Sequence, residues 1–223
     1  MKKTIGVLKI VLFIAILCLA ILFFSQTKVS AKTVIVTTLQ ELQEIMGATS
    51  YSTIEGTTLK ITDNFTWNLT DDVDMRIPEL TIDFNGKEMR IENDKRTNLG
   101  IHLSEGKVIL KDSQGETGGI YSIGNFIYLE HDTELIIENG QYTAGHVQEI
   151  DNGLITNIDN GLIKNQGGNI TVKNGKFNTT EYAILFNCNS GKLIINDGNF
   201  TGKGYFVEVR SRRNCLARFG SCY

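Results

Sequence analysis

Closely spaced acids are the residues of this chain best suited to chemistry. They fall into two groups, which are Asp71, Asp72 and Asp74, and Glu149, Asp151 and Asp159. Carboxylate oxygens are the ligands that calcium prefers. Acid clusters in an acidic chain are more often solvated surface than a site. We therefore assign no catalytic and no cofactor-binding residue, leave metal ligands open, and keep calcium binding as an alternative.

The three histidines lie in different segments, and their spacing is not that of metal ligands. They are His102, His131 and His146. A zinc site needs several such ligands at short, characteristic intervals. We therefore expect each histidine on a turn or on a solvent-facing strand position instead of in a site.

Charge is distributed unevenly along the chain. The formal net charge is −3, but every acidic residue lies between Glu41 and Glu208. The last residues contain Arg210, Arg212, Arg213 and Arg218 and no acid. The acidic body offers no basic face for a phosphate backbone, which argues against a nucleic-acid partner.

The N-terminus has the layout of a secretory signal peptide. Lysines at positions 2, 3 and 9 precede an apolar run at residues 10–24, and the small-residue pattern Val29-Ser30-Ala31 follows. Such a layout predicts a signal peptide over residues 1–31, cleavage after Ala31, and a secreted or cell-surface protein. The run is shorter than the roughly 20 residues of a spanning helix. An uncleaved anchor through residues 5–24 is the alternative, and it would be the only contact with a membrane.

The body of the chain is a repeat. Five short β-branched runs close on an Asn/Asp-Gly-type turn, at residues 80–86, 108–113, 135–140, 170–175 and 193–198. Successive runs are 28, 27, 35 and 23 residues apart. The longest interval contains an eight-residue duplication, because residues 158–165 nearly copy residues 150–157. This pattern is typical of a coil whose loops vary in length.

Each run has a second strand before it and a shorter element after it, and no helical pattern separates them. Three short strands per repeat cannot form βαβ units, so we predict an all-β fold. The expected architecture is a right-handed, single-stranded parallel β-helix, a solenoid, over residues 32–209. A strand at 33–36 and a helix-like pattern at 39–46, ended by Gly47, predict an N-terminal helical cap over residues 33–47.

The alternation of residues along each run predicts which side chains point into the coil. Leu135 and Ile137 should stack with Ile170, Val172, Leu193 and Ile195 inside the coil. Tyr142, Phe177 and Phe200 should form a further column, which we interpret as core filling, with a glycan-binding strip as the alternative. Asn139, Asn174 and Asp197 suit left-handed turn positions and side-chain ladders between rungs.

These segments resemble the bacterial pectate-lyase-like right-handed parallel β-helix superfamily. The residues that carry the resemblance are the cap, 58–62, 81–87, and 106–113 with 118–120. Within the superfamily they are most similar to adhesin-like surface proteins of Gram-positive and gut bacteria. The resemblance covers residues 33–209 and concerns the rungs, so it implies a fold more strongly than an activity.

The superfamily contains polysaccharide lyases and hydrolases, and their motifs are largely missing here. Resemblance to the polygalacturonase-like enzymes would imply Asn-Thr-Asp, Asp-Asp, Gly-His-Gly and Arg-Ile-Lys strings. In this chain Gly145-His146 lacks the second glycine, and Arg90-Ile91-Glu92 has an acid in place of the lysine. Elimination of the pectate-lyase kind would need calcium ligands and a basic residue to take the proton.

The tail at residues 210–223 differs from the repeats. The strand pattern stops after Arg210, and the composition turns to arginine and cysteine. We interpret the tail as a cap or as the product of truncation or frameshift. Cys188, Cys215 and Cys222 are an odd number for an exported protein, and their disulfide pairing stays open.

The sequence therefore predicts an exported bacterial β-helix that acts as a non-enzymatic adhesion or glycan-binding module. Its partners would be polysaccharides or glycans of host or cell surfaces. One alternative is a polysaccharide lyase or glycoside hydrolase acting on acidic polysaccharides, which requires acids on one face of adjacent rungs beside a Lys or Arg. Another is a structural remnant of a longer surface repeat protein.

Overall fold

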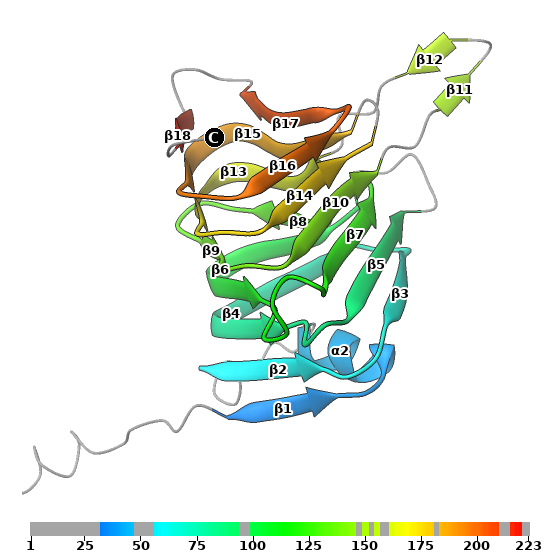
Figure 1. The fold of residues 1–223 in the computed structure, drawn as a ribbon, viewed down its shortest axis with the longest axis vertical. Helices are drawn as coiled ribbons and strands as arrows, with labels where there is room; N and C mark the ends of the chain where they lie inside the picture. The colour runs from blue at the N-terminus through cyan, green and yellow to red at the C-terminus, as the bar shows by residue number, and fades with distance from the viewer. Residues whose placement is uncertain are drawn as a thin grey trace, which may run out of the picture. The chain divides into compact units, whose positions relative to one another are not determined.

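The computed structural model describes residues 32–46, 56–93, 99–145, 149–151, 154–156, 161–180, 183–209 and 215–219. Its strands wind into a parallel β-solenoid of about six turns with one short N-terminal helix (Figure 1). The predicted β-solenoid and its helical cap are confirmed. The signal-peptide segment at residues 1–31 lies outside the described residues.

Two parallel sheets form the walls of the coil. The larger follows the order β1-β2-β4-β6-β8-β13-β15-β17, with β9 and β18 paired beside this path. Its strands are β1 (Thr33–Val36), β2 (Thr57–Ile61), β4 (Val73–Asp83), β6 (Ile101–Lys111), β8 (Ile127–Leu129), β9 (Glu134–Ile137), β13 (Gly161–Val172), β15 (Ile184–Ile195), β17 (Tyr205–Val209) and β18 (Cys215–Phe219). The six-stranded sheet contains β3 (Phe65–Leu69), β5 (Glu88–Asn93), β7 (Gly119–Ile123), β10 (Gln141–Gly145), β14 (Lys176–Thr179) and β16 (Asn199–Gly202).

The long strands of the larger sheet are interrupted by shifts in register. Between β4 and β6 the pairing shifts near Met75 and Ile77, and between β13 and β15 it shifts near Asn165. At the first of these places Gly106 has a φ of 86°, and an added Cβ would lie 1.9 Å from the carbonyl oxygen of Ile77. Only glycine fits such a close approach of two rungs. Each long strand therefore has two regularly paired segments, one on either side of its register shift.

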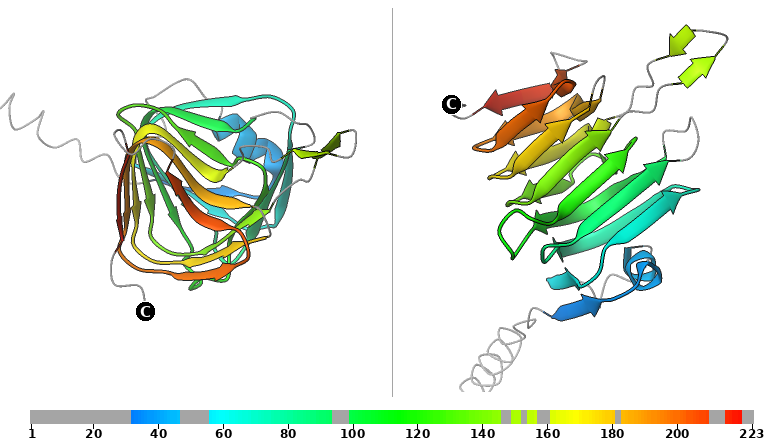
Figure 2. Two further views of the ribbon diagram at one scale, coloured as in Figure 1. Left: turned by 90° about the horizontal axis from the view of Figure 1, so that it is seen from above. Right: turned by 45° about the vertical axis from the view of Figure 1, so that its right-hand side comes forward.

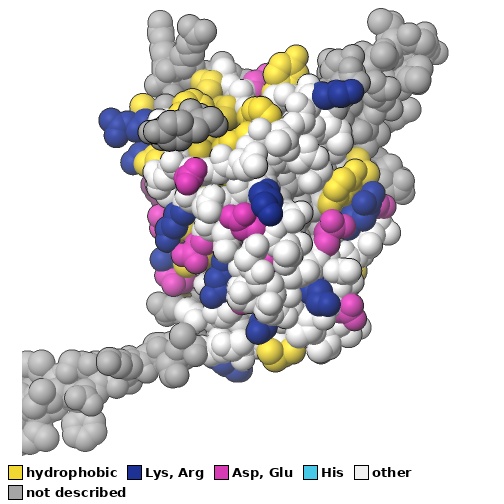
Figure 3. Space-filling model, viewed as in Figure 1, with side chains coloured by type: hydrophobic (Ala, Val, Ile, Leu, Met, Phe, Trp, Pro, Cys, Tyr) yellow, Lys and Arg dark blue, Asp and Glu magenta, His cyan; other side chains and the backbone are white. Residues whose placement is uncertain are grey.

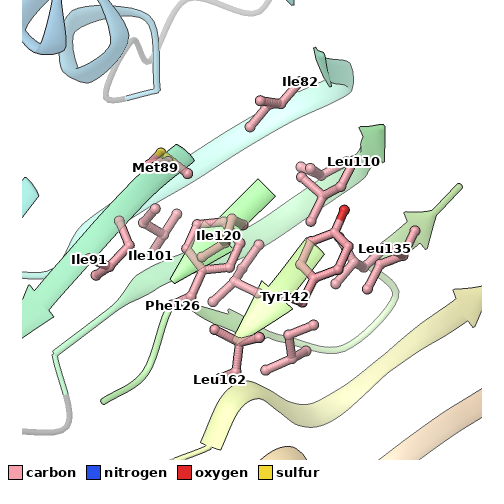
Figure 4. Close-up of a cluster of buried hydrophobic side chains, with 14 of the residues drawn as sticks. Ile82, Met89, Ile91, Ile101, Leu110, Ile120, Phe126, Leu135, Tyr142 and Leu162 are labelled. Atoms are coloured by element: carbon pink, nitrogen blue, oxygen red, sulfur yellow. The ribbon is translucent and has the colours of Figure 1, made fainter. Parts of the chain in front are cut away.

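Inward-facing side chains fill the coil as the alternation predicts. Leu135, Ile137, Ile170, Val172, Leu193 and Ile195 are all buried. Seen along the stack, the strands surround this core (Figure 2), and Figure 4 shows Phe126, Tyr142 and Leu162 packed together within it.

The aromatic column is also interior. Tyr142 stacks on Phe177 with ring centroids 5.3 Å apart, and Phe177 stacks on Phe200 at 4.7 Å. Tyr142 and Phe177 are buried, and Phe200 packs against the core cluster. The interpretation of the column as core filling is confirmed, and its alternative as a glycan-binding strip is wrong.

The N-terminal cap consists of β1 and helix α2 (Leu39–Met46). Thr38 begins the helix, because its hydroxyl accepts a hydrogen bond from the backbone N–H of Glu41 at 3.2 Å. Glu41 in turn accepts the backbone N–H of Thr38 at 3.1 Å, which completes a capping box. Leu42 and Val36 are fully buried, so the helix covers the core at this end. The predicted cap is confirmed for residues 33–46, and Gly47 lies outside the described residues.

The turn assignment needs correction. Asn139, Asn174 and Asp197 are not among the residues with positive φ, and the glycine after each takes that conformation instead, at 119°, 144° and 148°. Glycine adopts positive φ without a Cβ clash, so it takes the position that asparagine tolerates less well. Asn139 joins neighbouring rungs through the backbone instead of through a side-chain ladder, because its Oδ1 accepts the backbone N–H of Asp112 at 2.7 Å.

The eight-residue duplication contributes to an excursion from the coil. β11 (Glu149–Asp151) and β12 (Leu154–Thr156) pair antiparallel with each other and with no other described strand. Figures 1 and 2 show this hairpin beyond the stacked rungs, between β10 and β13 in the chain. The long 35-residue repeat interval is therefore one rung plus a hairpin.

Part of the arginine-rich tail belongs to the coil. β18 pairs in parallel with β15, with Cys215 opposite Gly191 and Phe219 opposite Ile195. The expectation that strand structure stops after Arg210 is therefore wrong for these residues. Cys188 is buried and forms a disulfide bond, and the partner's side chain lies outside those that the structure describes.

Candidate functional site

The structure separates the two groups of predicted acids. Asp71, Asp72 and Asp74 lie at or just before the start of β4 on the coil, and all are exposed. Glu149 and Asp151 lie in β11, which pairs only with β12 among the described strands. Asp159 lies outside the described residues.

Asp72 and Asp74 meet His102 on the outer face of β4 and β6. The Nε2 of His102 lies 3.4 Å from Oδ1 of Asp72, and its Nδ1 lies 3.4 Å from Oε1 of Glu130. Asp72 also accepts the backbone N–H of Gly100 at 3.0 Å, which fixes its carboxylate beside the ring. Residues from three rungs therefore converge on one imidazole. We call Asp72, Asp74, His102, Ser104 and Glu130 the His102 cluster.

Asp74 is held by its own partners within this cluster. The hydroxyl of Ser104 donates to Oδ1 of Asp74, and Nε of Arg76 donates to Oδ2 at 2.9 Å. These hydrogen bonds, with that from Ser104 as the largest cause, lower the pKa of Asp74 below its ordinary value. Asp74 therefore stays a carboxylate, suited to binding a cation or a hydroxyl and unsuited to donating a proton at neutral pH.

His102 rests on an aromatic base. Its ring stacks on Tyr128 with centroids 4.4 Å apart and planes 5° from parallel. Burial and then the charge of Asp72 raise the pKa of Tyr128 far above its ordinary value. The Nζ of Lys164 lies 5.2 Å from the centre of the Tyr128 ring. Tyr128 therefore supports the imidazole as a neutral platform.

The cluster could move protons, and its acids border a hollow. An imidazole between two carboxylates is suited to general acid or base chemistry. A cavity of about 470 Å³ lies beside it, lined by Gln43, Trp67, Asn68, Thr70, Asp71, Asp72, Val73 and Asp74. Across the described residues, no group of three or more His, Cys, Asp or Glu side chains has metal-binding geometry.

His102 occupies the solvent-facing strand position expected of it, and the neighbouring rungs bring an acid to each of its ring nitrogens. His131 is exposed in a turn, as predicted. His146 lies outside the described residues.

A second candidate surface lies on the outer face of the six-stranded sheet. One outward position on each strand forms a continuous column, in register from rung to rung. Its members are Thr66, Arg90, Tyr121, Thr143, Asn178 and Thr201, which we call the polar ladder. In Figure 3 this face is mostly backbone and side chains that are neither hydrophobic nor charged, with scattered charges.

Two contacts organise the ladder. The guanidinium of Arg90 lies 4.2 Å from the centre of the Tyr121 ring, and its Nε donates to Glu92 at 2.5 Å. Further along, Thr143, Asn178 and Thr201 border a shallow depression of about 260 Å³. Its other lining residues are Gln141, Lys176, Phe177 and Asn199. The depression therefore offers hydroxyl, amide and ammonium groups to a ligand.

Sequence reasoning missed several members of both surfaces. Tyr128, Lys164 and Glu130 were not singled out, and Arg90 was considered only as part of the Arg90-Ile91-Glu92 string. The available signal was the alternation itself, because the residue between two inward-facing residues points outward. Aligning those outward positions from rung to rung would have placed His102 beside Tyr128 and Tyr121 beside Thr143.

Comparisons with known proteins found no match from which a function could be inferred. No family model matches the chain, and neither a curated protein nor a solved structure matches it. In the part of the chain that the structure describes, no helix is long and apolar enough to cross a membrane.

Proposed function

We propose that the protein is an exported bacterial β-helix, secreted or held at the cell surface, that binds glycans without cleaving them. The signal-like leader and the resemblance to adhesin-like β-helix proteins support this function. The observation that carries it is the polar ladder, in which six rungs present hydrogen-bonding side chains in one column.

The spacing of the ladder suits a linear polymer. Neighbouring rungs lie about 4.8 Å apart, so one ligand chain can meet equivalent groups on several rungs. Each hydrogen bond would contribute only about 0.5–1.5 kcal/mol net, so affinity would depend on several rungs acting together. Tyr121, partly exposed and backed by Arg90, adds one surface for a sugar ring to pack against. The interior aromatic column takes no part.

A binding experiment tests this proposal. The full exported chain would be screened against immobilised polysaccharides, and the affinity of the best ligand measured by calorimetry. Replacing Thr143→Val and Asn178→Ala together should weaken binding about tenfold or more, because two ladder hydrogen bonds are lost. Asn196→Ala, an exposed amide off the ladder, is the matched control. Equal affinity of all three proteins for every ligand would refute the ladder as the binding surface.

The His102 cluster favours a second candidate function, a lyase or hydrolase acting on acidic polysaccharides. The enzyme alternative requires acids on one face of adjacent rungs beside a basic side chain. Asp72, Asp74 and Glu130 meet that requirement, with Arg76 and Lys164 nearby. This arrangement supports the alternative, although the lyase and hydrolase strings are missing from the sequence.

Activity assays separate the two functions. Release of new reducing ends or of unsaturated sugar from an acidic polysaccharide, abolished by His102→Gln and retained by the ladder variant, would favour the enzyme. Ladder-dependent binding with no product under the same conditions would favour the binding module.

A further inference from the structure

The His102–Tyr128 stack continues along the coil into a second polar group. Register pairing places Tyr128 beside Lys164, Lys164 beside Asn187, and Asn187 beside Glu208. Side chains at paired positions of a parallel sheet lie on the same face. We call His102, Tyr128, Lys164, Asn187 and Glu208 the outer column.

Asn187 is the unusual member of the outer column. Its side chain is fully buried, and neither Nδ2 nor Oδ1 has a hydrogen-bond partner among the described residues. Burying an amide without partners costs free energy, and native structures rarely retain such a group without a reason. The amide has two donor hydrogens and an acceptor oxygen to offer a ligand.

Lys164 stands next to this amide with its own charge uncompensated. Its ammonium faces the ring of Tyr128, and no described carboxylate forms an ion pair with it. Burial lowers the pKa of Lys164, as expected for an ammonium that has lost part of its hydration. An anion beside Lys164 would restore the favourable interactions that water no longer supplies.

We infer that Lys164 and Asn187 form a binding site for an oxyanion, a carboxylate or a sulfate group, carried by a hydroxylated ligand. Nζ of Lys164 and Nδ2 of Asn187 both donate to the anionic oxygens. Oδ1 of Asn187 accepts a hydroxyl of the same ligand, since it has no other described donor.

The neighbours of the site narrow the ligand further. Glu208 lies on the far side of Asn187, and Asp72 and Glu130 flank His102 beyond Tyr128. These carboxylates disfavour a ligand with several negative charges. One anionic group on the Lys164 side and a neutral hydroxyl on the Glu208 side fit the arrangement. A small hydroxy acid and an acidic sugar within a polymer share this chemistry.

This site is independent of the polar ladder, since it lies on the larger sheet. Its test therefore does not depend on the glycan-binding proposal. Failure of the ladder variant to lose glycan binding would leave the oxyanion site untouched, and the reverse also holds.

The experiment uses the full exported chain and four probes: gluconate, glucuronate, glucose 6-sulfate and neutral glucose. Affinity is measured by calorimetry and by the ligand-dependent rise in melting temperature. We expect the anions to bind and glucose not to bind. Preference for gluconate would indicate a free hydroxy acid, and preference for the ring forms would indicate an acidic sugar. Binding of glucose as tightly as its charged analogues would overturn the assignment.

Two variants test the residues. Lys164→Met should weaken anion binding about tenfold or more, because a charge-assisted hydrogen bond is lost. Asn187→Leu should also lose anion binding and raise the melting temperature without ligand, because an unpartnered buried amide is replaced by an apolar group of similar size. Lys173→Met is the control, since Lys173 is exposed and forms an ion pair with Glu138 of a neighbouring rung.

Two results would contradict the proposed anion site. One is an anion affinity that Lys164→Met leaves unchanged, and the other is the absence of any anion-dependent change in the wild-type protein. If Asn187→Leu lowers the melting temperature, Asn187 has a structural partner. The decision then rests on Lys164→Met alone.

Discussion

The two ends of the coil are built differently although the same repeat runs between them. At the N-terminal end, α2 covers the core and leaves Val36 and Leu42 fully buried. At the other end Tyr205, Leu216 and Phe219 are 62%, 54% and 56% exposed. A cavity of about 680 Å³, bordered in part by Ile195, Phe200 and Phe206, lies there. Figure 3 shows apolar side chains gathered around this end.

The contrast shows that the rung pattern determines which residues point inward but not how deeply each is buried. Phe177 and Phe200 occupy the same position in successive rungs, yet Phe177 is buried and Phe200 only partly so. An inward-facing residue is buried by the rung on each side of it, and the last described rung has a neighbour on one side only. The free energy gained by burial should therefore fall toward the C-terminal end of the described coil.

The largest expected effect tests this gradient inside the aromatic column. Phe177→Ala should lower the free energy of unfolding by about 3–5 kcal/mol, because it leaves a cavity between two stacked rings. Phe200→Ala should cost clearly less, since water already reaches part of that side chain. Urea denaturation of both variants measures the difference, and equal losses would contradict the gradient.

The helical cap provides the next test. Leu42→Ala should lower the free energy of unfolding by about 2–5 kcal/mol, because the side chain closes the core at this end. Gln40→Ala, an exposed change on the same helix, should be nearly neutral. If Leu42→Ala is as mild as its control, α2 does not stabilise the coil as a cap.

Two equivalent turns, one after β6 and one after β15, extend the comparison to polar residues. Asp112 and Asp197 follow equivalent positions, Leu110 and Ile195, which share one inward column. Asp112 is 2% exposed and accepts four backbone N–H groups, from Gly86, Gln114, Thr117 and Gly118. Asp197 is exposed and accepts the backbone N–H of Gly198. Asp112→Ala should cost about 2–3 kcal/mol and Asp197→Ala less than about 0.5 kcal/mol.

Low pH should reduce the loss of stability caused by Asp112→Ala. Burial opposes the charge of Asp112, but the backbone donors, Gly118 first, outweigh burial and hold its pKa below the ordinary value. A carboxyl with a lowered folded-state pKa stabilises above its unfolded pKa of about 3.9 and loses that contribution as the pH falls through the folded value. The gap between wild type and Asp112→Ala should therefore be full near neutral pH and shrink below about pH 4. A gap that does not change with pH would mean that the charge of Asp112 contributes nothing.

The fold was predictable because its signal is local and repeated. Alternation in runs such as 135–137 and 170–172 marks inward residues without any knowledge of neighbouring rungs. The turn positions were harder, because Asn174 and Gly175 both suit positive φ and only the backbone shows that glycine takes it. β18 was missed because residues 210–223 lack the apolar run and glycine turn that identify the other rungs.

The candidate sites were less predictable because they depend on register between rungs. Asp72 and Glu130 lie about 30 residues from His102 in opposite directions along the chain, and stacking brings all three together. That stacking depends on the pairing of Val73–Met75 with Ile101–Leu103, which no short motif announces. Asn187 was unremarked for the same reason, since a buried amide between Lys164 and Glu208 exists only in three dimensions.

The smallest expected effect on folding is at the C-terminal end of the described coil. Phe219→Ser should change the free energy of unfolding by less than about 0.5 kcal/mol, because the side chain is already mostly in water. It should reduce binding of a hydrophobic dye, because Phe219 borders the apolar cavity. Ile35→Ser is the matched control, since Ile35 is 52% exposed at the covered end, and it should leave dye binding nearly unchanged. A loss of several kcal/mol for Phe219→Ser would mean that this end is covered in solution, and the two ends would then be alike.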